Sequence, residues 1–281
     1  MDQKKIVITG ATDGIGKVAA RELYKKGYSL ILVGRNKQKL DQTMEELSTF
    51  KNQNSIYLFQ ADLSITKETK RIATEIRKNH PKVYCLLNNA GAFFSTRTLT
   101  SENLEATIAL NHLNYFVMAQ ELLPSLESYG SARIVNVASR AHVGVSLDFK
   151  NFFGEVDYSG WKQYQRSKLM NIYFTYSLSE KLKSKNISVN CLHPGFVKTK
   201  FGQNNEGLAK TLVTIGQNLF AISEDKGAET SIYLASSPEV EGVTGKYFVK
   251  SKAVNSSPQS YELDAKNSLW HLTEKILREL E

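Results

Sequence analysis

The stretch KIVITGATDGIGKVAARELYKK, residues 5–26, decides the fold expected of this chain. It starts with a short apolar run typical of a buried strand, passes through a glycine-rich turn at residues 10–16, and continues with the periodicity of an amphipathic helix. A strand that turns directly into a helix through glycines is typical of an open α/β sheet, in which helices cover both faces.

The rest of the chain repeats this alternation of strand and helix. Such alternation favours parallel strands joined by right-handed crossovers. We therefore predict a doubly wound, Rossmann-type α/β sheet of about seven parallel strands. The expected strands are 5–9, 29–34, 56–60, 83–88, 133–138, 188–193 and 246–250, and the expected helices are 15–26, 37–50, 66–79, 102–128, 160–185, 225–236 and, in the tail, 268–280.

The composition is that of one globular domain covering residues 1–281. Hydrophobic residues make up 41% and charged residues 23%, and no linker or repeat divides the chain. The two cysteines, Cys85 and Cys191, lie in apolar strand-like stretches, so we expect buried free thiols. No cluster of Cys and His has the spacing of metal ligands, and we expect no metal site.

Neither the apolar runs nor the charge indicates a membrane span or a nucleic-acid site. The apolar runs are far shorter than the ~18 residues of a membrane span. Strand-like residues begin at Ile6, which leaves no room for a signal peptide or an N-terminal anchor. The net charge is +8, but the lysines are scattered and no nucleic-acid-binding motif is present. We expect a cytoplasmic protein that binds no nucleic acid.

The glycine-rich turn has the features of a phosphate-binding loop. Gly10 permits a sharp turn, Gly14 lets the backbone approach a ligand, and Gly16 allows the helix to pack closely on the strand. The start of the helix then offers unpaired N–H groups and the positive end of its dipole. We predict that a dinucleotide binds here. The spacing GxxxGxG resembles that of the short-chain dehydrogenase/reductase family.

The end of the second expected strand indicates which dinucleotide is bound. Enzymes that use NAD generally place an acidic residue there, which holds the ribose 2′-hydroxyl and would repel a 2′-phosphate. This chain has Arg35 and Asn36 instead. Arg35 can pair with a 2′-phosphate and stack on the adenine, so we predict NADPH/NADP. The alternative is that Arg35 is a solvated loop residue.

Further motifs extend the resemblance along the chain. The sequence NNAG at residues 88–91 and the segment HPGFVKT at residues 193–199 match family signatures, and Asp62 follows the third strand as the adenine-contacting Asp does. A helix N-cap explains Asp62 equally well. The resemblance implies cofactor contacts at Gly10, Thr12, Asp13, Gly14, Ile15, Gly16, Arg35, Asn36, Asp62, Leu63, Asn89, Ala90, Gly91, Tyr164, Lys168, Pro194, Gly195, Val197 and Thr199.

A Tyr followed four positions later by Lys places both side chains on one face of a helix. A nearby ammonium would lower the pKa of the phenol, which could then exchange a proton with a carbonyl or alcohol. The pattern occurs at Tyr158/Lys162 and at Tyr164/Lys168. Gly160 suggests a helix start within the first copy, whereas the second lies inside the apolar-periodic helix. We prefer Tyr164 and Lys168 and keep the first copy as the alternative.

The resemblance completes a catalytic set of four residues: Asn111, Ser139, Tyr164 and Lys168. Ser139 ends the fifth expected strand and could bind the substrate oxygen, while the family Asn at position 111 supports a water near the Lys. Taken alone, Ser139 would be read as a turn former and Asn111 as a helix kink. Three histidines, His112, His142 and His193, have no converging partner in the sequence, so we expect structural roles for them.

The resemblance narrows to the retinol dehydrogenase-like branch. The motifs NHL at 111–113, ASRAH at 138–142 and YQRSKLMN at 164–171, and the long insert before Tyr164, carry it. This implies an NADPH-dependent carbonyl reductase that acts reversibly on a lipophilic aldehyde or ketone. A substrate loop is expected at 195–223, although its apolar residues also suit a plain amphipathic helix.

The expected oligomeric state rests on the family alone. The helices at 102–128 and 160–185 commonly pair across a four-helix interface, so we expect a homodimer. The competing reading from another class is a non-catalytic regulatory protein that binds NADPH on the same sheet. The complete set of four residues favours the enzyme.

Overall fold

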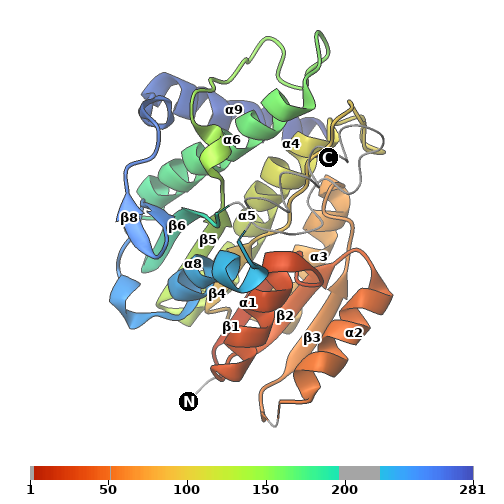
Figure 1. Cartoon of the computed structure of the whole chain (residues 1–281), viewed down its shortest axis with the longest axis vertical. Helices are drawn as coiled ribbons and strands as arrows, with labels where there is room; N and C mark the ends of the chain where they lie inside the picture. Colours follow the sequence, from red (N-terminus) through yellow and green to blue (C-terminus); the bar gives the residue numbers. More distant parts are fainter. Residues whose placement is uncertain (1–2, 51, 196–221, 281) are drawn as a thin grey trace.

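The computed structural model describes residues 3–50, 52–195 and 222–280. A single eight-stranded sheet runs through it in the order β3-β2-β1-β4-β5-β6-β7-β8 (Figure 1). The first seven strands are parallel and β8 is antiparallel to β7. The strands are β1 (Lys5–Thr9), β2 (Ser29–Gly34), β3 (Ile56–Gln60), β4 (Cys85–Asn88), β5 (Ala132–Val137), β6 (Ile187–His193), β7 (Tyr247–Val249) and β8 (Lys252–Val254).

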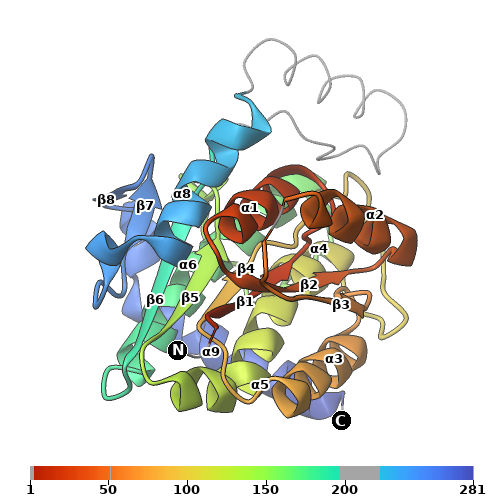
Figure 2. The same cartoon turned by 90° about the horizontal axis from the view of Figure 1, so that it is seen from below.

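Helices cover both faces of the sheet, which confirms the predicted doubly wound α/β fold (Figure 2). On one face lie α1, α2 and α8, and on the other lie α3, α5 and α6. Their bounds are α1 (Gly14–Lys25), α2 (Lys37–Ser48), α3 (Thr66–Asn79), α4 (Ala106–Ile108), α5 (Asn114–Tyr129), α6 (Gly160–Lys181), α8 (Glu224–Ser236) and α9 (Leu263–Glu279).

Alternating side chains of the buried strands form two separate cores. In β1, Val7 packs into the core beneath α3, α5 and α6, whereas Ile6 and Ile8 pack into the core beneath α1 and α8. All three side chains are fully buried. Strands buried on both faces read as continuous apolar runs, which is why the sequence indicated them clearly.

The strand order reverses between β1 and β4. The chain leaves β1 toward β2 and β3, and from β4 it proceeds in the other direction toward β5 and β6. Ligands of open α/β sheets bind beside such a switch point, at the carboxyl ends of the strands. The glycine-rich turn, the NNAG segment and Ser139 therefore come to one edge of the sheet.

The helix expected at 102–128 is divided into three parts. A short α4 is followed by a π-helical turn, η1 (Ala109–Leu113), and then by α5. A π-helical turn widens the helix by one residue, and such turns are frequent at functional sites. The widened turn holds Asn111, one of the four residues of the predicted catalytic set.

The last strand, β8, was not predicted. It forms a hairpin with β7 through Lys250 and Ser251, which both have positive φ, 49° and 59°. Two-residue hairpin turns need positive φ at both positions and usually carry Asn or Gly there. Because Lys and Ser stand at these positions, no hairpin signal is visible in the sequence.

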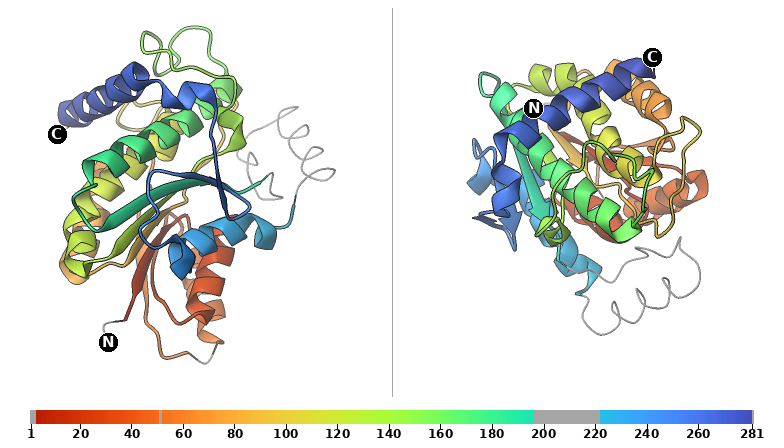
Figure 3. Two further views of the ribbon diagram at one scale, coloured as in Figure 1. Left: turned by 90° about the vertical axis from the view of Figure 1, so that its left-hand side faces the viewer. Right: turned by 90° about the horizontal axis from the view of Figure 1, so that it is seen from above.

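The C-terminal helix α9 lies on the outer side of α6 and reaches α5 (Figure 3). The Trp270 ring is 4.8 Å from that of Phe116 in α5 and 6.1 Å from that of Phe174 in α6, centroid to centroid. Lys266 Nζ lies 2.6 Å from Glu180 Oε1 in α6. α9 thus covers the faces of α5 and α6 that carry Phe116, Phe174 and Glu180, and two copies could pair through these faces only if α9 moved away.

Across the described ranges, no helix combines the length and the apolar character that a bilayer crossing requires.

Candidate active site

The glycine-rich turn is packed so closely that side chains are excluded. A Cβ on Gly16 would lie 2.2 Å from the Gly10 carbonyl oxygen and 2.4 Å from Asn89 Nδ2. Gly10 has a φ of +66°. Asn89 holds the turn in place, since its side-chain amide donates to the Thr9 carbonyl oxygen at 2.9 Å. The residues thus form a narrow backbone cradle at the start of α1, which fits the phosphates of a dinucleotide.

A lysine that the sequence analysis missed lies beside this cradle. Lys39 Nζ is 3.1 Å from Asp13 Oδ2, and Asp13 Oδ1 accepts a hydrogen bond from the Gly14 amide. Asn36 caps α2 by accepting from the Lys39 amide at 2.9 Å, and Arg35 is exposed at the end of β2. The i,i+4 spacing of Arg35 and Lys39 could have indicated that both cations lie at this corner.

The remaining predicted cofactor contacts lie at the ends of neighbouring strands. Asp62 follows β3, where its carboxylate accepts from the Ser64 amide at 2.9 Å and from the Ser64 hydroxyl at 2.7 Å. It therefore forms a turn and does not cap α3. Two of the predicted contacts, Leu63 and Ala90, are buried in the core. Five others are at least partly exposed, namely Thr12, Ile15, Gly91, Pro194 and Gly195. Val197 and Thr199 lie outside the described residues, as does most of the loop 195–223.

Ser139, Tyr164 and Lys168 come together at the carboxyl end of β5. The Tyr164 side chain hydrogen-bonds with that of Ser139. Lys168 Nζ lies 5.6 Å from the centroid of the Tyr164 ring and donates to the Val137 carbonyl oxygen at 3.2 Å. Lys168 is only 4% exposed and Tyr164 only 8% exposed. A phenol, a hydroxyl and an ammonium thus meet in a site with little access to water.

Asn111 connects this group to the NNAG segment. Its side-chain amide accepts from the Ala92 amide and donates to the Ala92 carbonyl oxygen, both at 2.9 Å, and also donates to Ser167 Oγ at 3.0 Å. A Cβ on Gly91 would lie 3.1 Å from Asn111 Oδ1 and 3.4 Å from Lys168 Nζ. The segment after β4 is therefore fastened directly against the predicted catalytic residues.

Burial sets the protonation of Tyr164 and Lys168. It raises the pKa of the Tyr164 phenol to about 12, against the lowering effect of the Ser139 hydrogen bond. It lowers the pKa of the Lys168 ammonium to about 8. The expectation that Lys168 lowers the pKa of Tyr164 is thus wrong for the chain alone, because burial disfavours the phenolate more strongly than its surroundings favour it.

The first YxxxK copy, Tyr158 and Lys162, does not join the site. Tyr158 precedes α6, and its hydroxyl donates to Glu105 Oε1 at 3.0 Å. Burial, followed by the charge of Glu105, raises the pKa of Tyr158. Lys162 is exposed on the first turn of α6. Of the two copies, only Tyr164 and Lys168 meet Ser139.

The three histidines hold backbone segments in place. His142 Nε2 accepts from the Ser257 amide at 3.0 Å, so its Nδ1 carries the proton and donates to the Ser139 carbonyl oxygen at 2.6 Å. His193 Nδ1 accepts from the Arg140 amide at 3.1 Å. His112 Nε2 contacts Thr273 Oγ1 in α9 at 3.0 Å. These contacts agree with the structural roles expected.

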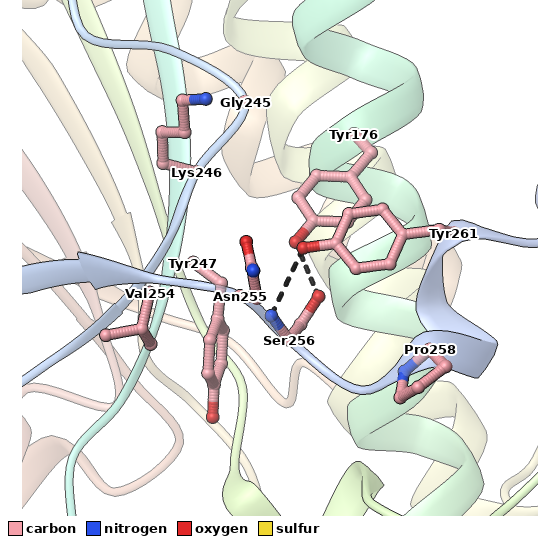
Figure 4. Close-up of a pocket in the computed structure, with 9 residues that line it drawn as sticks. All are labelled: Tyr176, Gly245, Lys246, Tyr247, Val254, Asn255, Ser256, Pro258 and Tyr261. Carbon is pink, nitrogen blue, oxygen red and sulfur yellow. Dashed lines mark hydrogen bonds between the residues drawn. The ribbon is translucent and has the colours of Figure 1, made fainter.

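A cavity of about 470 Å³ lies away from this site, between α6, β7 and the segment after β8 (Figure 4). The rings of Tyr176 and Tyr261 stack across it at 5.5 Å. Ser256 joins them, since its Oγ lies 2.7 Å from the Tyr176 hydroxyl and its amide donates to the Tyr261 hydroxyl at 3.2 Å. None of the predicted site residues lines this cavity.

Comparison with known proteins agrees with this geometry. The family model described as short chain dehydrogenase matches residues 4–208. Retinol dehydrogenase 14 of Mus musculus is 32% identical over 289 residues, which cover 99% of this chain and 86% of the relative. Retinol dehydrogenase 12 of Homo sapiens is 30% identical over 274 residues, which cover 98% of this chain and 86% of the relative.

Solved structures share the fold. An uncharacterised protein from Mycobacterium paratuberculosis superposes with a TM-score of 0.77 and 26% identity, over 98% of this chain and 94% of that one. An alcohol dehydrogenase from the archaeon Thermococcus sibiricus, complexed with 5-hydroxy-NADP, gives a TM-score of 0.68 and 22% identity, over 88% and 95%. The chain is therefore an oxidoreductase that belongs to the short-chain dehydrogenase/reductase family, in its retinol dehydrogenase-like branch.

Proposed function

We propose that the chain reduces an aldehyde or ketone to an alcohol with NADPH. The observation that carries the proposal is the meeting of Ser139, Tyr164 and Lys168 beside the glycine cradle, with Asn111 fastened against them. When bound, the cofactor would supply a hydride to the carbonyl carbon. The chain's own residues must then orient the carbonyl and give its oxygen a proton.

Tyr164 supplies that proton in our proposal. With a pKa of about 12, its phenol is protonated at neutral pH and can donate to the oxygen as negative charge develops there. Ser139 would hold the same oxygen by a hydrogen bond. The phenolate left behind takes a proton from Lys168, whose pKa of about 8 suits such a transfer near neutral pH. Lys168 then regains its proton from solvent.

We assign the preference for NADPH to Arg35 together with Lys39. Arg35 is exposed at the end of β2 and can pair with a 2′-phosphate. Asp13, which would repel that phosphate, is paired with Lys39 at 3.1 Å. Removal of Lys39 should therefore weaken binding of NADPH more than binding of NADH, because the Asp13 charge is then unopposed.

The test is carbonyl-dependent oxidation of NADPH by the wild-type chain and by Tyr164→Phe. We expect the variant to lose at least about a hundredfold in kcat, which is the usual contribution of a general acid. Lys162→Met is the matched control, because it removes the exposed lysine of the other YxxxK copy. An unchanged rate in Tyr164→Phe would favour the competing reading, a regulatory protein that binds NADPH without reducing a carbonyl.

The cytoplasmic location and the homodimer remain predictions of the sequence. Cell fractionation checks the first. For the second, two copies that pair through α5 and α6 would first have to displace α9 from these helices.

A further inference from the structure

Trp161 lies next to the proposed proton donor and is half exposed. It is one helical turn before Tyr164 on α6, and the two rings stack with centroids 5.7 Å apart and planes 25° apart. The ring of Phe93, in the segment after β4, meets both edge-on, 6.2 Å from Trp161 and 6.1 Å from Tyr164. We call Trp161 and Phe93 the aromatic wall.

The aromatic wall is held in position by the start of α6. A Cβ on Gly160 would lie 2.2 Å from the Phe94 carbonyl oxygen, so the helix begins in direct contact with the segment that carries Phe93. Tyr158 adds a second tie, since its hydroxyl donates to the buried carboxylate of Glu105 at 3.0 Å. Trp161 is thus fixed relative to Phe93 before any substrate arrives.

The exposure of Trp161 is the unusual feature. Its side chain is 51% exposed, whereas the other tryptophan, Trp270, is 7% exposed in the contact with α9. The insert before Tyr164 also exposes Val143 and Val156, by 52% and 64%. The exposed part of the Trp161 indole contributes nothing to the stability of the chain itself, so a ligand can contact it without any loss of packing.

We infer that the aromatic wall binds the flat, aromatic or conjugated part of the carbonyl substrate, and that Trp161 is thereby a specificity-determining residue. This rests on the proposed function, since the carbonyl must reach Tyr164. Planar π systems stack on an indole face, which a puckered saturated ring cannot do as well. The wall would therefore select planar substrates over saturated ones of the same size.

A matched pair of aldehydes tests the inference. Benzaldehyde and cyclohexanecarbaldehyde have the same carbon skeleton, but only the first is planar. We expect Trp161→Ala to raise KM for benzaldehyde by on the order of tenfold and KM for cyclohexanecarbaldehyde by at most about twofold, with kcat little changed. Trp161→Phe should keep most of the preference. Val156→Ala, an exposed apolar change in the same insert, is the control.

Two outcomes would overturn the inference. If Trp161→Ala lowers kcat equally for both aldehydes, Trp161 only orients Tyr164. If neither KM nor kcat changes, the exposed indole does not touch substrate. Each ratio compares a variant with wild type for one aldehyde, so the different intrinsic reactivity of the two aldehydes cancels.

A binding measurement separates this inference from the proposed function. Benzyl alcohol and cyclohexylmethanol, the corresponding alcohols, are titrated while tryptophan emission is followed. We expect a saturable change with benzyl alcohol in the wild-type chain and none in Trp161→Phe. If the emission changes with benzyl alcohol but NADPH is oxidised with none of the aldehydes, the aromatic wall binds planar ligands and the proposed reaction is wrong. If NADPH is oxidised but the emission change is the same in wild type and Trp161→Phe, the proposed reaction is supported and binding at the aromatic wall is wrong.

Discussion

Lys168 is a buried ammonium whose Nζ donates to a backbone carbonyl, that of Val137, at 3.2 Å. Its position beside the Tyr164 ring serves the proposed proton transfer, but removing a charge from water is costly. A buried charge that takes part in catalysis commonly lowers the stability of the folded state. Two measurements, one of activity and one of stability, should therefore respond to Lys168 in opposite ways.

The activity should depend on pH in opposite senses for the two directions. Above pH 8 Lys168 loses its proton, so kcat/KM for reduction should fall. Oxidation of an alcohol needs the Tyr164 phenolate, whose pKa is about 12, so that rate should still be rising at the highest pH that the chain tolerates. Initial rates from pH 6 to pH 10 give both profiles. A reduction rate that is constant over this range contradicts the assigned role of Lys168.

The stability should rise when Lys168 is replaced by Met. Between pH 8 and pH 10.5 the unfolded chain holds this proton more tightly than the folded chain, so the folded state gains stability as the pH rises through that window. Below pH 8 the full cost, about 3 kcal/mol, is present. Lys168→Met should therefore be more stable than wild type by about this amount at pH 7, as measured by denaturant unfolding.

The control for this measurement is Lys162→Met, which replaces an exposed lysine of the same helix. It should leave the free energy of unfolding unchanged within about 0.5 kcal/mol. Near pH 10.5 the advantage of Lys168→Met should have disappeared. Equal midpoints for Lys168→Met and wild type at pH 7 would mean that the ammonium is hydrated in solution.

At the scale of elements, the start of α6 fixes the geometry of the site. Gly160 packs against the backbone of Phe94, and Ser159 caps the helix by accepting from the Lys162 amide at 3.4 Å. From that point Tyr164 and Lys168 follow at helical spacing. The orientation of both side chains toward Ser139 thus depends on one close approach between a helix and the segment after β4.

Gly160→Ala should destabilise the chain, although alanine is the better helix former. The added methyl group would lie 2.2 Å from the Phe94 carbonyl oxygen, so backbone must move. We expect a loss of about 1–3 kcal/mol in thermal or denaturant unfolding, as for an overpacked core. The movement would also part Phe93 from Trp161. Lys162→Ala, two residues further along and exposed, should change stability little. A more stable Gly160→Ala would show that the two backbones are not in contact.

Elements with a strong local signal could be predicted, and those defined by tertiary contact could not. The expected strands at 5–9, 29–34 and 56–60 agree with β1, β2 and β3 to the residue. β1 and β2 are buried parallel strands, which form continuous apolar runs. The edge strand β3 is only partly buried, but its sequence IYLFQ is still mostly apolar. The helix expected at 102–128 is interrupted by η1, where Asn111 is bonded to Ala92 in another segment. A pattern read along one helix contains no information on such a bond.

The same limit applies to the site. Family motifs pointed to Ser139, Tyr164, Lys168 and Asn111, which the structure brings together. The helix start expected at Gly160, which favoured the second YxxxK copy, is the start of α6. Lys39 and Trp161 were missed, since their importance comes from neighbours distant in the sequence. The direction of the Tyr164 pKa was wrong because spacing predicts a charged neighbour but does not predict burial.

At the scale of the whole molecule, α9 determines how copies of the chain can meet. Trp270 is 7% exposed between Phe116 and Phe174, and Lys181 Nζ lies 4.5 Å from its ring centroid. With this helix in place, two copies cannot pair through this face of α5 and α6, so if light scattering finds the predicted homodimer of the 31.6 kDa chain, we expect it to use another surface.

Removing the tail tests whether α9 keeps two copies from pairing through α5 and α6. A chain that ends before Leu263 exposes Phe116 and Phe174, and it should either associate or unfold at lower temperature. Trp270→Ala is the milder variant, which removes the ring but keeps the helix. A dimer in the intact chain, with Trp270 still protected from quenching by acrylamide, would show that copies meet through a different surface.

The hairpin of β7 and β8 closes one end of the sheet in a way that protects the chain from its own copies. A parallel sheet that stopped at β7 would offer a buried, apolar strand to any other extended segment. β8 instead presents three exposed residues, starts with Lys252, and continues from a tight reversal that carries Lys250. A partner strand could make few hydrogen bonds there and would have to approach positive charge. Growth of the sheet from molecule to molecule is thereby disfavoured at this edge.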